Sequence, residues 1–207
     1  SVNSRLVADC KQHGDGLLVP VGAINPSLPD WQEDLRRCHE VHHMQAIRIH
    51  PNYHRYSLDS ALCNDLFQAA LDRGLIVQLV LSMEDVRVQH PLMQMPVVDT
   101  APLAALLEKF PQLPLVIMNN SAAVRPVQAA ALAKAGNVYF EISHFESVGA
   151  LENWGKEVPV ERILFGSYFP FFNLEAALLK FQESQLGGFA MTAIQSGNAR
   201  ELLQASS

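Results

Sequence analysis

The sequence is poor in the features that bring a protein to nucleic acid or to a membrane. Among its 207 residues, 15 are Lys or Arg and 21 are Asp or Glu, so the formal net charge is -6. No run of basic residues is present. Nucleic acid and anionic membrane surfaces are therefore excluded as partners, because both require clustered positive charge. No apolar stretch is long enough to cross a bilayer either.

Cysteine is also scarce, which bears on the cellular compartment. The three cysteines, Cys10, Cys38 and Cys63, are scattered, and none belongs to a C-x-x-C pair. An odd number without framework spacing is typical of reduced thiols, so we expect packing roles and a cytoplasmic location. The sequence shows no basic and apolar leader, and it has no initial Met, so we expect a shortened or processed N-terminus.

Several familiar catalytic signatures are missing. There is no phosphate-binding P-loop, no G-x-G-x-x-G fingerprint and no G-x-S-x-G elbow. A His-x-His pair does not occur, and the nearest cluster, His39, His42 and His43, falls on an expected helix. We interpret that cluster as a solvated helix face and helix end, with a metal site as the less favoured alternative.

The sequence does contain a regular alternation of two kinds of segment. Short runs rich in Val, Ile, Leu and Phe predict strands at residues 17–24, 46–50, 75–82, 113–119, 138–143 and 162–167. Stretches with helical spacing predict helices at residues 31–42, 58–73, 101–110, 124–135, 151–157, 174–184 and 189–203. Strand and helix in alternation predict an α/β fold with a parallel sheet.

The longest irregular piece, residues 83–99, follows an expected strand. In a parallel barrel such a loop lies at the face where active sites are built. Loops of this length are often lids or binding segments, and the alternative is a surface excursion with solvated charges.

Two stretches near the C-terminal end carry a resemblance to a known family. Residues 161–170, Glu-Arg-Ile-Leu-Phe-Gly-Ser-Tyr-Phe-Pro, resemble the final barrel strand of the amidohydrolase superfamily, in the branch that includes aminocarboxymuconate-semialdehyde decarboxylase. Residues 197–203, Gly-Asn-Ala-Arg-Glu-Leu-Leu, are similar to its closing helix, and weaker matches occur at 21–26 and 47–51. The resemblance implies a parallel (β/α) TIM barrel with the last six of its eight β/α units present, forming a single domain over residues 1–207.

The resemblance also implies a divalent metal such as Zn²⁺, but the sequence departs from the family at the ligand positions. Tyr168 stands where the family has a metal-binding Asp, Asn119 or Asn120 where it has a His, and Ser82 at another ligand position. A catalytic zinc needs about three His or carboxylate ligands, and an amide nitrogen has no lone pair to give. We therefore predict no metal ligand and no cofactor in this chain.

Strand alternation indicates which side chains face the barrel interior. Arg48 and His50 share one face of their strand, opposite two isoleucines, and Tyr139 and Glu141 share a face of theirs. Two interpretations of Arg48 stay open. It forms a buried ion pair with Glu141, or it binds a substrate carboxylate through its planar fork of donors.

The segment after His50 is the most polar and aromatic loop on the expected active face. It contains Tyr53 and His54, and it is either an acid–base and binding loop or a hydrogen-bonded turn with exposed aromatic rings. The resulting site hypothesis assigns catalytic roles to His50, Glu141 and Tyr168. It assigns substrate binding to Arg48, Tyr53, His54, Asn119 and Asn120.

Three functions remain open from the sequence. The first is a hydrolase or decarboxylase of a small carboxylate or amide, and the second is a non-catalytic relative that binds a small molecule or a partner protein. The third is a truncated product without independent function. Six strands of a barrel designed for eight leave sheet edges uncovered, so we also expect a homo-oligomer.

Overall fold

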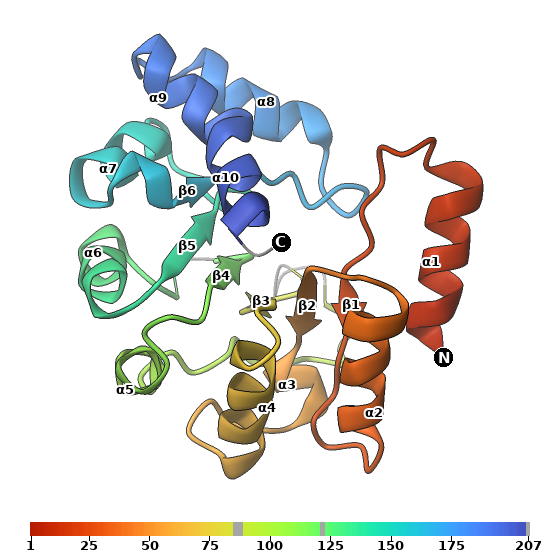
Figure 1. Cartoon of the computed structure of the whole chain (residues 1–207). Coiled ribbons are helices and arrows are strands. Elements are labelled where there is room, and N and C mark those ends of the chain that lie inside the picture. The colour runs from red at the N-terminus through yellow and green to blue at the C-terminus, as the bar shows by residue number, and fades with distance from the viewer. Residues whose placement is uncertain (85–88, 121–122, 206–207) are drawn as a thin grey trace.

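The computed structural model describes residues 1–84, 89–120 and 123–205 (Figure 1). Its strands form one parallel sheet in which neighbours in the sequence are neighbours in space. The strands are β1 (Gly22–Ala23), β2 (Ala46–Ile49), β3 (Ile76–Val80), β4 (Leu115–Met118), β5 (Val138–Glu141) and β6 (Ile163–Leu164). The prediction of an α/β fold with a parallel sheet is confirmed.

Most helices surround this curved sheet on its outer side, whereas the C-terminal helix lies against its inner face (Figure 1). In chain order they are α1 (Val2–His13), α2 (Trp31–Arg36), η1 (Arg37–Val41), α3 (Pro51–His54), α4 (Ala61–Leu71), α5 (Leu103–Lys109), α6 (Pro126–Ala135), α7 (Ala150–Glu157), η2 (Val160–Arg162), α8 (Leu174–Gln182), α9 (Gly188–Thr192), η3 (Ala193–Gly197) and α10 (Asn198–Ala205). Within the described residues, none of these helices has the length and apolar character needed to cross a membrane.

Three local predictions need correction. The strand expected at 17–24 begins only at Gly22, and Leu17 is 85% exposed, because this apolar segment runs along the open side of the sheet. The single helix expected at 189–203 is divided into α9, η3 and α10, with a π-helical turn between the two α-helices. Helix α1 was not predicted, because it is mostly polar and buries only Asn3 and Val7.

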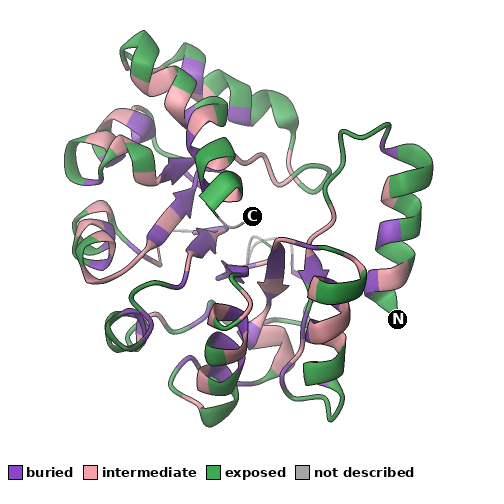
Figure 2. Cartoon of the chain, in the orientation of Figure 1, coloured by how far each residue is buried: buried purple, intermediate pink, exposed green. Residues whose placement is uncertain are grey.

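Alternating side chains of the strands belong to two separate cores, and most strand residues are buried (Figure 2). Ile47 and Ile49 are fully buried in the larger core, between the sheet and its covering helices. Ala46 belongs to a smaller cluster on the opposite face of the sheet, which also contains residues of α10. Arg48 shares the face of Ala46, because residues two apart along a strand point the same way. The predicted inward orientation of Arg48 is therefore confirmed.

The backbone groups at both outer edges of the sheet are hydrogen-bonded by helix residues and not by further strands. On β1, the backbone N–H and C=O of Ala23 are bonded by the Asn3 side chain at 2.8 and 3.0 Å. On β6, the Asn198 side chain donates to the carbonyl of Ile163 at 2.8 Å. The next outward group, the N–H of Phe165, donates to the carbonyl of Ile194 at 3.0 Å. We call the Asn3 and Asn198 side chains the edge caps.

Candidate functional site

Inward-facing side chains gather at and beyond the carboxyl ends of β2 to β6. Arg48 donates from Nε to Oε1 of Gln78 at 2.9 Å, and the backbone N–H of Asn119 donates to Glu141 at 3.3 Å. The phenol of Tyr168 lies within electrostatic range of Arg48 and of the Asn119 side chain. We call this set, Arg48, Gln78, Asn119, Glu141 and Tyr168, the cup.

Arg48 is the cation of the cup. Burial lowers the pKa of its guanidinium, and the nearby Glu141 and Tyr168 act in the opposite direction. The ion pairs among the described residues all lie on helix surfaces, and none joins Arg48 to Glu141. Of the two interpretations of Arg48, the ion pair with Glu141 is not formed, because Glu141 is held by other donors while Arg48 is bonded to Gln78 on the neighbouring strand.

Glu141 is 3% exposed and its oxygens already have partners. They accept hydrogen bonds from the backbone N–H of Ser143 at 2.6 Å, from the Ser143 hydroxyl at 2.7 Å and from Asn119. Burial raises the pKa of Glu141, and these hydrogen bonds oppose that rise. Gly166 makes room for the carboxylate, because a Cβ at that position would collide with Glu141.

Asn119 has an open donor in the interior. It is 1% exposed, and its backbone has φ of 52°, a left-handed conformation that asparagine tolerates better than most residues. Its Oδ1 accepts from the Ser143 hydroxyl at 3.2 Å, and its Nδ2, which bonds no other described atom, lies toward the phenol of Tyr168. A buried donor without an acceptor costs about 1–3 kcal/mol, so this atom is suited to receive a ligand oxygen.

Tyr168 joins two loops across the cup. Its hydroxyl donates to the backbone carbonyl of Met83 at 2.6 Å, and burial raises its pKa. Its ring packs with those of His144, Phe171 and Phe172 at centroid distances of 5.8, 5.2 and 5.4 Å. In this arrangement the phenol proton is already engaged, so the residue contributes an aromatic wall and a link between loops.

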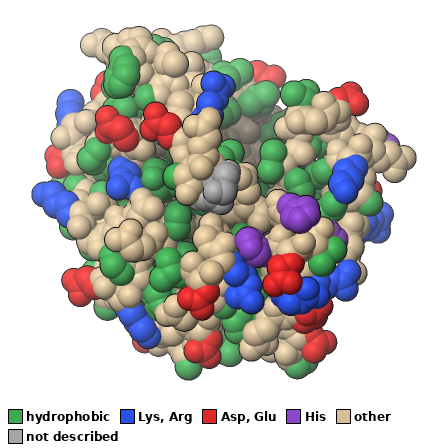
Figure 3. Space-filling model, in the orientation of Figure 1, with side chains coloured by type: hydrophobic (Ala, Val, Ile, Leu, Met, Phe, Trp, Pro, Cys, Tyr) green, Lys and Arg blue, Asp and Glu red, His purple; other side chains and the backbone are tan. Residues whose placement is uncertain are grey.

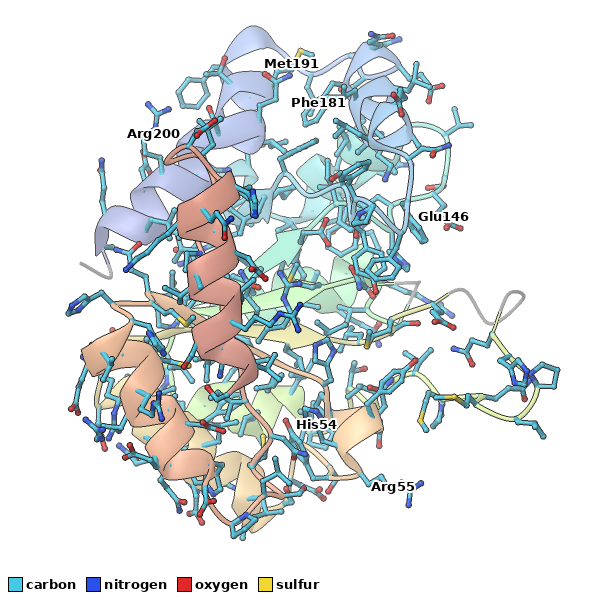
Figure 4. All side chains as sticks on the ribbon, turned by 90° about the vertical axis from the view of Figure 1, so that its right-hand side faces the viewer. His54, Arg55, Glu146, Phe181, Met191 and Arg200 are labelled. Atoms are coloured by element: carbon cyan, nitrogen blue, oxygen red, sulfur yellow. The ribbon has the colours of Figure 1, made fainter. Side chains whose placement is uncertain are left out.

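His50 and His54 stand at the two ends of the short helix α3. Their rings meet edge to face at 6.0 Å, and Nδ1 of each is buried without a hydrogen-bond partner among the described residues. Burial, together with His54 and Arg48, lowers the pKa of His50 to about 4, so its imidazole is neutral at pH 7. Figure 4 shows that Arg55, the next residue, points away from the molecule.

Tyr53 belongs to the same short helix, α3, and its phenol is an electrostatic neighbour of Tyr168 in the cup. Burial and the nearby Glu84 raise the pKa of Tyr53, and its phenol interacts electrostatically with that of Tyr168. Asn120, in contrast, is directed elsewhere. Its amide bonds the backbone of Val124 twice, at 2.7 and 2.8 Å, so its polar atoms are engaged within the chain.

Two residues that hold the site were not predicted. Ser143 supplies two of the three hydrogen bonds to Glu141, and Lys180 donates to the carbonyls of Ile142 and Ser143 at 2.8 and 2.6 Å. Ser143 follows Glu141 by two positions, so strand alternation could have identified it. Lys180 belongs to α8, and nothing in its local sequence indicates that it reaches β5.

The loop at 83–99 is only partly described, since residues 85–88, with Asp85 and Arg87, lie outside the described residues. Beyond them, Gln89 is buried and its amide bonds the backbone of Glu84 and Met95. This part of the loop is therefore folded on itself.

The donors of the cup do not match a divalent metal. Glu141 is saturated by hydrogen bonds, Asn119 offers an amide nitrogen, and Arg48 places a positive charge among them. Across the described ranges, no group of three or more His, Cys, Asp or Glu side chains could hold a metal ion. His42, from the histidine cluster noted in the sequence, instead bonds Ser4 at 3.1 Å.

Comparison with known sequences now identifies the family. The family model described as Amidohydrolase matches residues 2–204, almost the whole chain. The chain belongs to the amidohydrolase family. This confirms the resemblance seen in the two C-terminal motifs. No curated protein matches this amidohydrolase chain.

Solved structures share its fold at low sequence identity. An uncharacterised TIM-barrel protein from Bordetella bronchiseptica has a TM-score of 0.72 and 17% identity, over 99% of this chain and 72% of its own. The 5-carboxyvanillate decarboxylase of Sphingomonas paucimobilis has a TM-score of 0.79 and 13% identity, over 98% and 71%. A dihydroxybenzoic acid decarboxylase from a Polaromonas species, determined with bound manganese and the inhibitor 2-nitroresorcinol, has a TM-score of 0.75 and 14% identity, over 100% and 74%. The curved sheet of this amidohydrolase-family chain is thus that of a (β/α) barrel.

Proposed function

We propose that this amidohydrolase-family chain binds a small carboxylate at Arg48 and acts on it as a decarboxylase or hydrolase. The observation that carries the proposal is a pair of unused donors in one cup. Nε of Arg48 donates a hydrogen bond to Gln78, and no described residue bonds the two terminal nitrogens of Arg48. Nδ2 of the buried Asn119 is also available to donate to a ligand. A planar guanidinium is well suited to a carboxylate, which it can bind through two parallel hydrogen bonds.

The walls of the cup favour a flat substrate. Tyr168 and Phe171 stack at 5.2 Å with an angle of 27° between their rings, so they offer aromatic faces beside the cup. Aromatic rings prefer such offset contacts with other rings. Two solved structures similar to this chain are decarboxylases of aromatic acids by name, which agrees with a substrate of this kind.

Decarboxylation would need a proton donor. The C–C bond between the carboxylate carbon and the substrate carbon that carries it breaks, and CO₂ leaves. The electron pair left on that substrate carbon must then take up a proton. Glu141 is the candidate for this role, because burial raises its pKa, as a general acid requires, although its hydrogen bonds act in the opposite direction. His50 is neutral at pH 7 and is the second group that could move a proton. Arg48 and the open Asn119 amide would hold the carboxylate in the meantime.

A second function, ligand binding without catalysis, is favoured by one specific observation. The Tyr168 proton is engaged by the carbonyl of Met83 at 2.6 Å. The carboxylate of Glu141 is likewise engaged by Ser143 and Asn119. Residues whose hydrogen bonds are already satisfied have less freedom to take part in a reaction.

Calorimetric titration with benzoate and 2,6-dihydroxybenzoate tests the binding site. We expect Arg48→Gln to weaken binding by about 10-fold to 100-fold, as the loss of a charge-assisted hydrogen bond predicts. The matched control is Arg200→Gln, since Arg200 is exposed on α10 (Figure 4). Equal binding by wild type and Arg48→Gln, or no binding at all, would contradict the proposal.

Carbon dioxide release from the same acids then separates the two functions. Turnover that is lost in Glu141→Gln supports the decarboxylase. Binding that depends on Arg48, without release of CO₂ or hydrolysis of the corresponding amides, supports the non-catalytic relative.

A further inference from the structure

A cavity lies inside the curve of the sheet, next to the cup. Its volume is about 220 Å³, and it is lined mainly by apolar side chains. The strands contribute Ala46, Ile76, Val116 and Leu164, and α10 contributes Ala199 and Leu202. We call this space the interior cavity. On this side of the molecule, Figure 3 shows the surface hollowed beside α10, with hydrophobic side chains around the hollow.

The interior cavity borders two members of the cup, Gln78 and Glu141, and Arg48 lies one residue beyond this lining. Ala46 precedes Arg48 by two residues, and Ile76 precedes Gln78 by two, so each pair points to the same face. Gln78 and Glu141 line the polar end of the cavity, and Gln78 accepts the hydrogen bond from Arg48. A carboxylate at Arg48 would therefore have the apolar space one layer below it.

The volume is large for a barrel interior. Barrels of this kind normally fill their interior with layers of side chains, and an apolar cavity of ~150 Å³ can hold benzene. The interior cavity is of the same order, enough for a ring or a chain of roughly six methylenes.

The edges of the sheet argue against a protein strand as the occupant. A strand added to β1 or β6 would have to displace the Asn3 or Asn198 side chain from the backbone groups that it bonds. A small molecule enters without breaking these bonds. Its negative end would meet the cation of the cup, and its apolar end would meet apolar walls.

We propose that the ligand of this chain is an amphipathic monocarboxylate whose apolar tail occupies the interior cavity while its carboxylate is held by Arg48. The inference rests on the proposed function, since it adds a tail site to the same carboxylate site. Tail length, rather than the head group alone, would then determine which acids bind.

A series of straight-chain acids from acetate to dodecanoate tests this inference by calorimetry, below the micelle concentration of each acid. Each added methylene is expected to strengthen binding by about fourfold, from the usual gain for burying one such group. The gain is expected to stop after roughly six methylenes, when the cavity is full.

Variants that fill the interior cavity give the decisive comparison. Ala199→Phe places a ring in the space, and we expect it to keep acetate binding and lose the dependence on chain length. Ala176→Phe, at an exposed position of α8, is the matched control and should retain that dependence. If Ala199→Phe does not fold, Val19→Phe serves instead, because Val19 lines the cavity but is 62% exposed.

The possible failures are distinguishable. Binding that depends on Arg48 but does not change with chain length would overturn the tail site and leave the carboxylate site standing. A chain-length effect that persists in the cavity-filling variant would place the tail elsewhere and also overturn the inference. Absence of any binding that depends on Arg48 would overturn both proposals.

Discussion

At the scale of single residues, His50 and Glu141 make the stability of the protein depend on pH in opposite directions. The pKa of His50 falls from 6.5 to about 4 on folding, so the unfolded chain binds more protons between these values. Stability from His50 is therefore complete above about pH 6.5 and is lost as the pH falls toward 4. The pKa of Glu141 is raised from 4.5, so its contribution is lost as the pH rises through its folded value.

Replacement of His50 measures the contribution of this residue to the pH dependence of stability. We expect His50→Gln to flatten the pH dependence of the unfolding free energy between pH 7.5 and 4.5, by about 2–3 kcal/mol relative to wild type. Urea unfolding at several pH values measures this directly. The exposed His13→Gln is the control and should follow wild type, whereas an unchanged slope in His50→Gln would show that the buried imidazole has no such effect.

The sequence predicted the orientation of single residues better than their partners. The inward position of Arg48 followed from strand alternation alone. Its ion pair with Glu141 did not form, because Ser143 and the backbone of Asn119 compete for that carboxylate. Such competition depends on the stagger between strands, which the sequence does not display. The orientation of the Asn119 amide depends on the same stagger between strands, so the sequence could not predict it.

At the scale of elements, the edge caps connect the helices to the sheet. Asn198 begins α10 and donates to the carbonyls of Val160 and Ile163 at 2.7 and 2.8 Å. Both carbonyls lie at the outer edge of β6 or just before it. Asn3 performs the corresponding task at β1 from helix α1. An uncovered edge invites association with other chains, and these amides occupy it.

Asn198→Ala tests the cap on β6. We expect it to lower the free energy of unfolding by roughly 1–3 kcal/mol, because two carbonyls lose their donor. Urea unfolding and light scattering measure the stability and the tendency to aggregate. Gln195→Ala, an exposed position on η3, is the matched control. Stability of Asn198→Ala equal to that of the control would show that the cap contributes nothing.

Elements were predicted where the apolar pattern was regular. Strands β2 to β5 fall within their predicted ranges. Each reads as a nearly continuous apolar run, because both faces of a parallel sheet are covered. The prediction failed at 17–24 and at 189–203. The first is apolar but uncovered, and the second contains a π-helical turn that interrupts the helical period without any change in composition.

At the scale of the whole molecule, we predict that this chain differs in metal content from the solved structure with bound manganese. We expect that dialysis against Mn²⁺ or Zn²⁺, followed by metal-free buffer, leaves well under one metal ion per chain by elemental analysis. Three suitable ligands are needed and no such group occurs in the described residues. One metal per chain after dialysis would refute this expectation.

A single substitution should not change that result. Tyr168→Asp restores one carboxylate at the family's position, yet the amide of Asn119 and the cation of Arg48 remain nearby. We expect this variant to retain no more metal than wild type. Retention of one ion per chain by the variant alone would show that the other ligands are already in place.

The barrel itself could be predicted as a whole, because the alternation of strands and helices and the two C-terminal motifs agree. The interior cavity could not, because it depends on how far α10 enters the curve of the sheet. That position is set by packing between residues far apart in the sequence.

The edge caps also have a consequence for synthesis on the ribosome. Asn3 precedes Ala23 by 20 residues, so its side chain has been made before β1 leaves the exit tunnel. Asn198 follows Ile163 by 35 residues, so β6 leaves the ribosome before the side chain that caps it. The nascent protein thus passes through a stage in which the β1 edge of the sheet has its cap and the β6 edge does not. During that interval the outer edge of β6 is open to pairing with another extended chain, until α10 follows.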